Sequence, residues 1–292
     1  MISFDVPEPD YDRYSNRQLA AVPLAVLLVA LLVIGATWAL TGAPASLGIE
    51  LSGGTELTVQ TTDDRADIQT AFDEDVESVQ QIQGETDQYI LTFETIDEEG
   101  LSDQAEANLE SPTPDDPVVL SSREFSASFA AEQQQMALYA VAVGFLGMGL
   151  IVFLLFRTFI PSIAIIVSAF SDIMIPLAAM NLLGISLSLG TVAALLMLIG
   201  YSVDSDILLN NHILRRGGEF YESTYRAMQT GVTMTVTSMS AMFVMFVVAF
   251  VFGIEILSNI GLILFIGLAA DLLNTYSLNL SLLRWYSFRG VS

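Results

Sequence analysis

The chain has 292 residues, of which 53% are hydrophobic, and its mean hydropathy is +0.58. Its formal charge is −23, because 33 acidic residues face ten basic ones, and all ten basic residues are arginine. The hydropathy excludes an ordinary soluble domain, and the charge argues against binding to nucleic acid.

The chain has no cysteine and a single histidine, His212, which we expect at the level of the lipid headgroups. This composition excludes a disulfide framework, a thiol- or histidine-based metal site and a Ser-His-Asp triad. We therefore expect no metal, no cofactor and no enzymatic activity. An acidic, lysine-free composition is also typical of proteins from salt-adapted archaea.

Six apolar stretches are long enough to cross about 30 Å of hydrocarbon, which takes about 20 helical residues. They lie at 19–40, 136–156, 161–182, 187–211, 228–252 and 257–283. The first stretch is too long for a signal peptide and lacks a small-residue cleavage site, so we expect it to be retained. The sequence predicts a membrane α-helical protein with helix 1 at 19–40, helices 2–6 within 136–283, and tails at 1–18 and 284–292.

The segment 41–135 is the only large polar part of the chain, and it holds 22 of the 33 acidic residues. Alternating patterns predict strands and amphipathic patterns predict helices. The predicted strands are Thr55–Thr61, Glu77–Gln83 and Asp87–Glu94, and the predicted helices are Asp63–Asp75 and Leu101–Glu110, the latter with Ser102 as N-cap. This β-α-β-β-α order favours a small α+β domain of the ferredoxin-like kind.

The positions of the arginines predict the orientation of the chain. If the six spans alternate, eight of the ten arginines fall on one side: Arg13, Arg17, Arg157, Arg215, Arg216, Arg226, Arg284 and Arg289. The positive-inside rule then places both termini in the cytoplasm and the acidic domain, residues 41–135, outside the cell.

The fourth span contains two carboxylates, Asp204 and Asp206, within "IGYSVDSDILLNNHILRR". Each aspartate costs about 2.5–3.5 kcal/mol at the centre of a membrane helix, so this helix needs protein or water around it. At 100° per residue the two point to nearly opposite faces. One stripe holds Ser202, Asp206 and Asn210, and the other holds Tyr201, Asp204 and Asn211. The depth of the two aspartates in the bilayer stays open.

Three further charged residues lie in or next to apolar spans. Asp172 lies well inside the third span, Asp271 lies in the sixth, and Arg226 begins the fifth. Asp271 is either part of a polar pathway or a residue near the membrane interface, and Arg226 is either a polar partner or a topology anchor that reaches the headgroups. Together with Asp204 and Asp206, these residues are the candidates for a proton or ion path or for polar contacts between helix bundles.

Several motifs carry a resemblance to a known family. They are "GIELSGGTELTV" after the first span, "FRTFIPSIAIIVSAFSDI", "TVAALLMLIGYSVDSDILLNNHILRR", "STYRAMQTGVTMTVTS" and "TYS" in the sixth span. In order and spacing, over almost the whole chain, the sequence resembles the SecF type of the SecD/SecF family, in its archaeal form, within the resistance-nodulation-division superfamily.

The resemblance implies an accessory of protein export. Such a subunit joins SecD at a SecYEG-type translocation channel and promotes late translocation or release of the translocating polypeptide. Bacterial members are thought to couple export to proton flow through an aspartate in span four and an arginine entering span five. Arg226 matches that arginine, whereas Ser205, between Asp204 and Asp206, stands at the aspartate position.

Two other functions stay open at this stage. The chain fits half of a superfamily pump for lipids or small molecules, since such pumps carry two six-helix halves and this chain has one. A passive scaffold is the third alternative, but it gives the intramembrane aspartates no purpose. A partner of the same layout favours export, and self-pairing favours the pump. The expected partners are SecD, the channel, the exported chain and membrane lipid.

Overall fold

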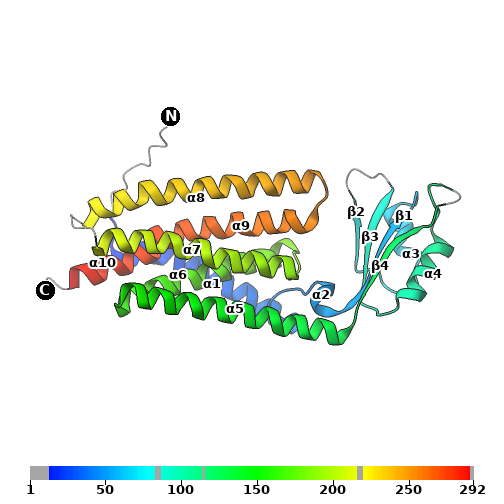
Figure 1. Ribbon diagram of the computed structural model, residues 1–292, viewed down its shortest axis with the longest axis horizontal. Coiled ribbons are helices and arrows are strands. Elements are labelled where there is room, and N and C mark those ends of the chain that lie inside the picture. Colours follow the sequence, from blue (N-terminus) through cyan, green and yellow to red (C-terminus); the bar gives the residue numbers. More distant parts are fainter. Residues whose placement is uncertain (1–12, 83–86, 114–115, 216–219, 290–292) are drawn as a thin grey trace.

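The computed structural model describes residues 13–82, 87–113, 116–215 and 220–289. Within these ranges six helical segments are long and apolar enough to cross a membrane. They run side by side as a bundle, and a small sheet domain stands beyond one end of it (Figure 1). The predicted six-helix membrane fold is confirmed.

Five spans are continuous helices and the sixth is a composite. The spans are α1 (Asn16–Thr41), α5 (Ala127–Phe156), α6 (Phe159–Leu183), α7 (Leu189–Arg215), α8 (Phe220–Val251) and the run of α9 (Glu255–Leu273), the π-helical η2 (Asn274–Asn279) and α10 (Leu280–Arg289). The helix α5 begins before the expected residue 136 because the Ser126 hydroxyl accepts the Phe129 backbone N–H at 3.3 Å and caps it. Apolar patterning marks only the part that crosses lipid.

The helices α6 and α7 form the centre of the bundle. In their most apolar windows 61% and 56% of residues are buried, compared with 11% in α5 and α8. Side chains from α5, α6, α7 and α9 pack into one core, which includes Val152, Ile165, Met180, Leu198, Ile263 and Leu264. Polar groups on the inner faces of α6, α7 and α9 are therefore held away from lipid.

Close approach of α8 and α9 depends on a glycine. A Cβ built at Gly261 would lie 2.8 Å from the Phe246 backbone nitrogen and 3.1 Å from the Met242 carbonyl oxygen. Because both atoms belong to the backbone of α8, no rotamer change relieves the contact. A small residue at a helix contact is what membrane helix packing favours.

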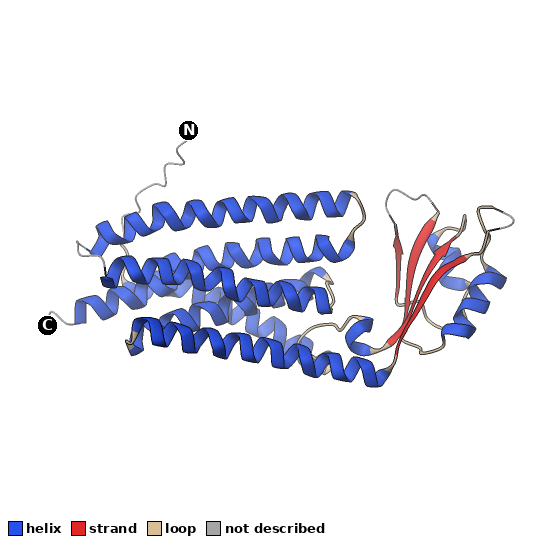
Figure 2. Ribbon diagram, in the orientation of Figure 1, coloured by secondary structure: helices blue, strands red, loops and turns tan. Residues whose placement is uncertain are grey.

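The polar segment folds as an antiparallel sheet with two helices on one face. In chain order it contains β1 (Gly54–Gln60), α3 (Arg65–Thr70), β2 (Ser78–Gln81), β3 (Gln88–Phe93), α4 (Glu98–Asn108) and β4 (Val119–Phe125). The sheet order is β2-β3-β1-β4. Figure 2 shows both helices on the side of the sheet that faces away from the bundle. This β-α-β-β-α-β arrangement is the predicted ferredoxin-like one.

Two details of the domain differ from the sequence prediction. The strand β4 was not expected, and it pairs with β1 from Gly54–Phe125 to Val59–Val119. The helix α4 begins at Glu98, and its N-cap is Asp97, whose carboxylate accepts the Gly100 backbone N–H at 3.1 Å. Ser102 therefore lies inside the helix. Several residues in this acidic stretch could cap a helix, so the sequence alone does not identify the N-cap of α4. The packing of its buried residues, Leu101 and Ala105, against the sheet fixes where the helix begins.

The chain that joins α1 to the domain is tied to the loop between α6 and α7. The backbone N–H of Gly48 donates to the Leu187 carbonyl at 2.9 Å, and that of Leu187 donates to the Ser46 carbonyl at 2.7 Å. A short helix, α2 (Ile49–Ser52), follows and leads into β1. At Gly54, φ is +143° and a Cβ would lie 2.2 Å from the Phe93 carbonyl oxygen, so this strand start requires glycine.

Candidate functional site

Three aspartates from three helices lie inside the bundle. Asp172 of α6 is 1% exposed, and Asp206 of α7 and Asp271 of α9 are 0% exposed. At 1.5 Å per residue, Asp206 lies about 14 Å along α7 from Arg215. We call Asp172, Asp206 and Asp271 the aspartate cluster. Its members are the groups that an apolar bundle would least tolerate without partners.

The Asp172 carboxylate accepts two hydrogen bonds. The Ser202 hydroxyl of α7 donates to Oδ2 at 2.5 Å, and the Asn274 amide Nδ2 of η2 donates to Oδ1 at 2.5 Å. Both carboxylate oxygens are therefore satisfied by neutral donors from neighbouring helices. These bonds join α6 to α7 and to the sixth span.

Thr275 bridges the other two carboxylates. Its hydroxyl lies 2.9 Å from Asp206 Oδ1 and 3.2 Å from Asp271 Oδ1. Asn279 also donates from Nδ2 to Asp206 Oδ1, at 2.7 Å. A hydroxyl has one proton to donate and can also accept. Both of its contacts are therefore full hydrogen bonds when one of the two carboxyl groups carries a proton.

The π-helical turn η2 supplies the bridging side chains. Asn274, Thr275 and Asn279 all lie within it and all are 0% exposed. A π-helical turn widens the helix locally and is often found at functional sites. Here it lets two adjacent residues, Asn274 and Thr275, reach Asp172 on one side and Asp206 on the other.

Several buried acceptors in the cluster have no hydrogen-bond partner among the described residues. They are Asp206 Oδ2, Asp271 Oδ2, and the amide oxygens Oδ1 of Asn274 and Asn279. Carboxylate and amide oxygens of this kind suit a proton, a water or a small cation. Within the described part of the chain, no group of three or more His, Asp or Glu side chains has the arrangement of a metal site.

The structure does not bring Arg226 to the aspartate cluster. It lies near the start of α8, where its guanidinium pairs with Glu222 four residues earlier, and its side chain is 61% exposed. Among the described residues, none of the three clustered aspartates lies within salt-bridge distance of an arginine. Among the described residues, no arginine therefore neutralises the aspartate cluster.

The two aspartates of α7 point in different directions, as predicted. Ser202, Asp206 and Asn210 are fully buried, whereas Asp204 and Tyr201 are exposed. Ser205 is 2% exposed and its hydroxyl lies 3.5 Å from the Thr235 hydroxyl of α8. Asp204 thus lies on an uncovered face of α7, outside the cluster.

Sequence reasoning missed Asn274, Thr275 and Asn279 as site residues. The available signal was a pair of asparagines five residues apart within an apolar span, because a buried amide needs a polar partner. His212, expected at the headgroups, is 7% exposed in α7.

A second polar feature lies between the domain and the bundle. A cavity of about 450 Å³ is lined by carboxylates from the α1–β1 connection, the sheet and α9, namely Glu50, Glu56, Glu77 and Glu255. Burial raises the pKa of the Glu56 carboxyl, against the attraction of Arg123, and Glu50 raises it further. Burial also raises the pKa of Glu77, with a contribution from Glu94. We call this feature the acidic cavity.

The fold and its buried carboxylates define a class: a six-helix membrane protein with one ferredoxin-like domain between its first two spans. Residues 104–289 match the family model described as protein export membrane protein SecD/SecF, C-terminal. The chain belongs to the SecD/SecF family of protein-export membrane proteins, in its archaeal SecF type.

Similar proteins agree along the full length. The chain is 56% identical to a protein-export membrane protein SecF from Haloferax volcanii, over 100% of both chains, and 57% identical to one from Haloquadratum walsbyi, also over 100% of both. It is 36% identical to a SecF of Methanolacinia petrolearia over 96% of this chain and 97% of the relative. The two haloarchaeal relatives agree with the source expected from the composition.

The fold also matches a longer protein. A crystal structure of SecDF, a translocon-associated membrane protein from Thermus thermophilus, superposes with a TM-score of 0.73 at 20% identity. The match covers 96% of this chain and 39% of that one, so this chain spans about two fifths of the SecDF length. A super-membrane-facing form of SecDF gives a TM-score of 0.60 over 98% of this chain. At this identity the likeness concerns the fold alone.

Proposed function

We propose that this chain is an accessory subunit of the Sec protein-export machinery that acts with SecD at a SecYEG-type channel and promotes late translocation or release. Family membership supports the export role. The uncovered polar groups support a partner: Asp204 is exposed on α7, and Thr230, Thr233 and Thr237 are exposed along α8. A second bundle over these faces would remove them from lipid.

We propose that both termini of the chain lie in the cytoplasm. The ferredoxin-like domain, within 41–135, then lies outside the cell. The start of α1 and the end of α10 lie at the end of the bundle away from the sheet (Figure 1). The arginine asymmetry supports this orientation. Protease added to intact cells should cleave the domain; cleavage only at the α7–α8 connection would reverse the orientation.

We further propose that the aspartate cluster exchanges a proton or a small cation during export. The single observation behind this is the Thr275 hydroxyl between Asp206 and Asp271, with unpartnered acceptors next to it. Three buried carboxylates without a compensating charge are unfavourable, so the cluster needs to bind positive charge. Binding and release of that charge would alter the hydrogen bonds between α6, α7 and the sixth span.

Asp204 and Arg226 have a different role in this proposal. Both are exposed, on α7 and α8, so they suit contacts with the partner bundle. The carboxylate of Asp204 and the guanidinium of Arg226 would be stabilised most by residues of opposite charge on SecD. They then help to align the two bundles, whereas Asp172, Asp206 and Asp271 act inside this one.

The test uses the full chain assembled with SecD and Asn variants at each clustered aspartate. Asparagine keeps the size but removes the ionisable group. If the cluster exchanges charge, Asp206→Asn and Asp271→Asn should assemble normally and slow secretion. Exposed Asp103 in α4 provides the matched control, Asp103→Asn. Normal secretion by all three variants and by the triple variant would remove the exchange role.

The same preparation separates export from the pump alternative. Affinity purification in mild detergent should recover SecD with the tagged chain. Recovery of two differently tagged copies of this chain without SecD, together with unchanged secretion when the chain is deleted, would favour half of a pump for lipids or small molecules.

A further inference from the structure

Two motifs of the sequence meet at one contact between α8 and the sixth span. Gly231 belongs to "STYRAMQTGVTMTVTS" in α8, and Tyr276 belongs to "TYS" in η2. A Cβ built at Gly231 would lie 2.1 Å from the Tyr276 hydroxyl oxygen and 3.5 Å from Cζ of the same ring. The tip of the Tyr276 ring therefore fills the space that a larger residue would need in place of the glycine. We call this space the Gly231 notch.

The Tyr276 ring is also enclosed away from the notch. It is 8% exposed and belongs to a buried apolar cluster with Leu209 of α7, Met228 of α8, and Leu280 and Leu283 of α10. Protein interiors are packed as densely as organic crystals, so a ring surrounded in this way has little room to turn. A shift of the ring is therefore passed to the backbone of η2.

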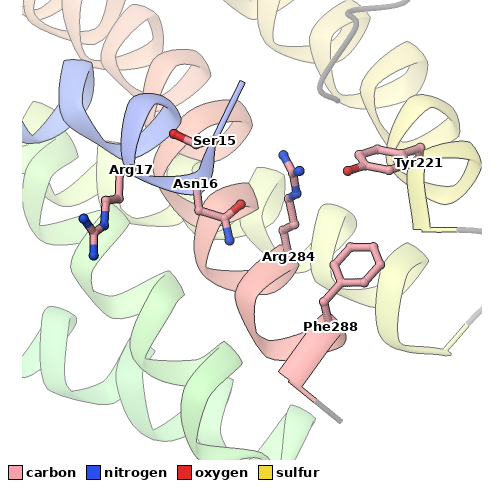
Figure 3. A pocket seen from close by; sticks show the side chains of 6 residues that line it. All are labelled: Ser15, Asn16, Arg17, Tyr221, Arg284 and Phe288. Carbon is pink, nitrogen blue, oxygen red and sulfur yellow. The ribbon is translucent and has the colours of Figure 1, made fainter. Parts of the chain in front are cut away.

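The helix α8 is held against the sixth span on both sides of the notch. Towards its start, the Phe288 ring of α10 lies 5.5 Å from that of Phe220 and 6.5 Å from that of Tyr221, and Figure 3 shows Phe288 beside Tyr221. Towards its end, the backbone of Phe246 packs closely on Gly261 of α9. Because α8 is held at both places, a larger residue in the notch displaces η2 rather than α8.

Tyr276 directly follows Thr275, whose hydroxyl bridges Asp206 and Asp271. The two residues are adjacent in one turn, so their Cα atoms are about 3.8 Å apart and move together. The Thr275 bond to Asp271 Oδ1 is 3.2 Å long, already beyond the usual range of about 2.5–3.0 Å for O–H···O bonds. Relief of the 2.1 Å contact to an ordinary 3.4 Å takes roughly 1 Å of movement or more. A displacement of that size is enough to break the bond to Asp271.

We propose that Tyr276 is a positioning residue: held in the Gly231 notch, it places the Thr275 hydroxyl between the two carboxylates according to the position of α8. This inference rests on the proposed exchange at the aspartate cluster and adds a means of regulating it. The opposite face of α8 carries the exposed Thr233 and Thr237, where the partner bundle is proposed to lie. A partner that displaces α8 would therefore reach the cluster through one contact.

The first measurement tests the fit of the ring in the notch. Gly231→Ala should lower the unfolding midpoint of the full chain in mixed micelles. In a Tyr276→Phe background the loss should shrink to less than about half, because the atom at 2.1 Å is gone and the ring carbon at 3.5 Å is in ordinary contact. The matched control is Gly147→Ala in α5, where a Cβ meets nothing within 4 Å. An equal loss in both backgrounds, or in Gly147→Ala, would overturn the notch.

The second measurement asks whether the notch acts through Thr275. In a double-mutant cycle, Thr275→Val should lose less than about half as much in the Gly231→Ala background as in the unaltered chain, because the hydroxyl is already displaced. Gly261→Ala creates a close contact, at 2.8 Å, about 21 Å along the sixth span from Thr275, so its cycle with Thr275→Val should be additive. Additive losses in the Gly231→Ala cycle, or a Thr275→Val that costs nothing in the unaltered chain, would overturn the positioning role.

The positioning role and the exchange role fail on different results. If Gly231→Ala and Thr275→Val are coupled but secretion is normal in every Asn variant of the aspartate cluster, the exchange role fails and the positioning contact stands. If those Asn variants slow secretion while the cycle is additive, the exchange role stands and the positioning role is overturned. Should Gly231→Ala not fold, Tyr276→Leu, which empties the notch, takes its place in the cycle with the same two outcomes.

Discussion

Replacement of Thr275 by valine removes the hydroxyl between Asp206 and Asp271 while nearly keeping the shape of the side chain. The hydroxyl lies 2.9 Å and 3.2 Å from the two carboxylate oxygens. Asp206 Oδ1 keeps its bond from Asn279, whereas Asp271 Oδ1 loses the bond from Thr275. The substitution therefore acts mainly on Asp271.

The expected loss follows from the number of donors. One hydroxyl donates one proton, so the substitution removes one charge-assisted hydrogen bond, worth about 1.5–3 kcal/mol, and not two. Thr275 and Asp271 are both 0% exposed, so bulk solvent does not reach the lost donor's position. We expect Thr275→Val to lower the free energy of unfolding by about 2 kcal/mol, with the upper part of the range reached if Asp271 stays ionised.

The measurement is reversible unfolding of the purified full chain in mixed micelles, followed by tryptophan fluorescence. Thr275→Ser keeps the hydroxyl and loses only a methyl group, so it should lie much closer to the unaltered chain than Thr275→Val does. If Thr275→Val unfolds within about 0.5 kcal/mol of the unaltered chain, or if the serine variant loses as much as the valine variant, the bridging hydroxyl is not a stabilising contact.

Three other predictions concern separate parts of the molecule. Gly261→Ala should destabilise the bundle by about 1–3 kcal/mol, because the new Cβ meets the α8 backbone at 2.8 Å, whereas Gly200→Ala, with open space around its Cβ, should not; unfolding of both in micelles compares them. Because burial raises the pKa of Glu56 from its ordinary 4.5, the folded state binds this proton more tightly, so stability should fall as pH rises above about 4.5. Glu56→Gln should flatten that pH dependence in thermal unfolding followed by circular dichroism. Asp204→Asn should leave the unfolding of the isolated chain within about 0.5 kcal/mol, since the side chain is exposed, but reduce recovery of SecD in pull-downs.

The sequence predicted the membrane helices and the character of the two faces of α7, because apolar length and helical periodicity are local properties. Ser202, Asp206 and Asn210 were placed on one stripe, and all three are buried. The first three strands of the domain were also predicted from local patterns, and in β1 the buried and half-buried side chains alternate. Such patterns identify which side chains share a face.

The tertiary partners of these helix and strand faces could not be predicted from local sequence patterns. The strand β4 reads "VLSSREF", and none of its seven side chains is fully buried. Its sequence therefore has no regular alternation of buried and exposed residues, and its pairing with β1 comes from tertiary contact. The partners of Asp172 come from helices 30 and 102 residues further along the chain. The π-helical turn that contains Asn274 and Thr275 is only six residues long, which is too short for its sequence to show a distinct periodicity.

The two aspartates in the fourth span, Asp204 and Asp206, therefore have different surroundings and different expected roles. Asp206 is buried, and its Oδ1 accepts hydrogen bonds from two side chains of this chain, Thr275 and Asn279. Asp204 is exposed on the α7 face that is left uncovered by α5 and α8, so a partner has to supply its surroundings. A change at Asp206 should alter the chain itself, and a change at Asp204 should alter its assembly. In our proposal, an internal exchange site and an external contact therefore lie within two residues of one helix, and movement of α7 would couple the two.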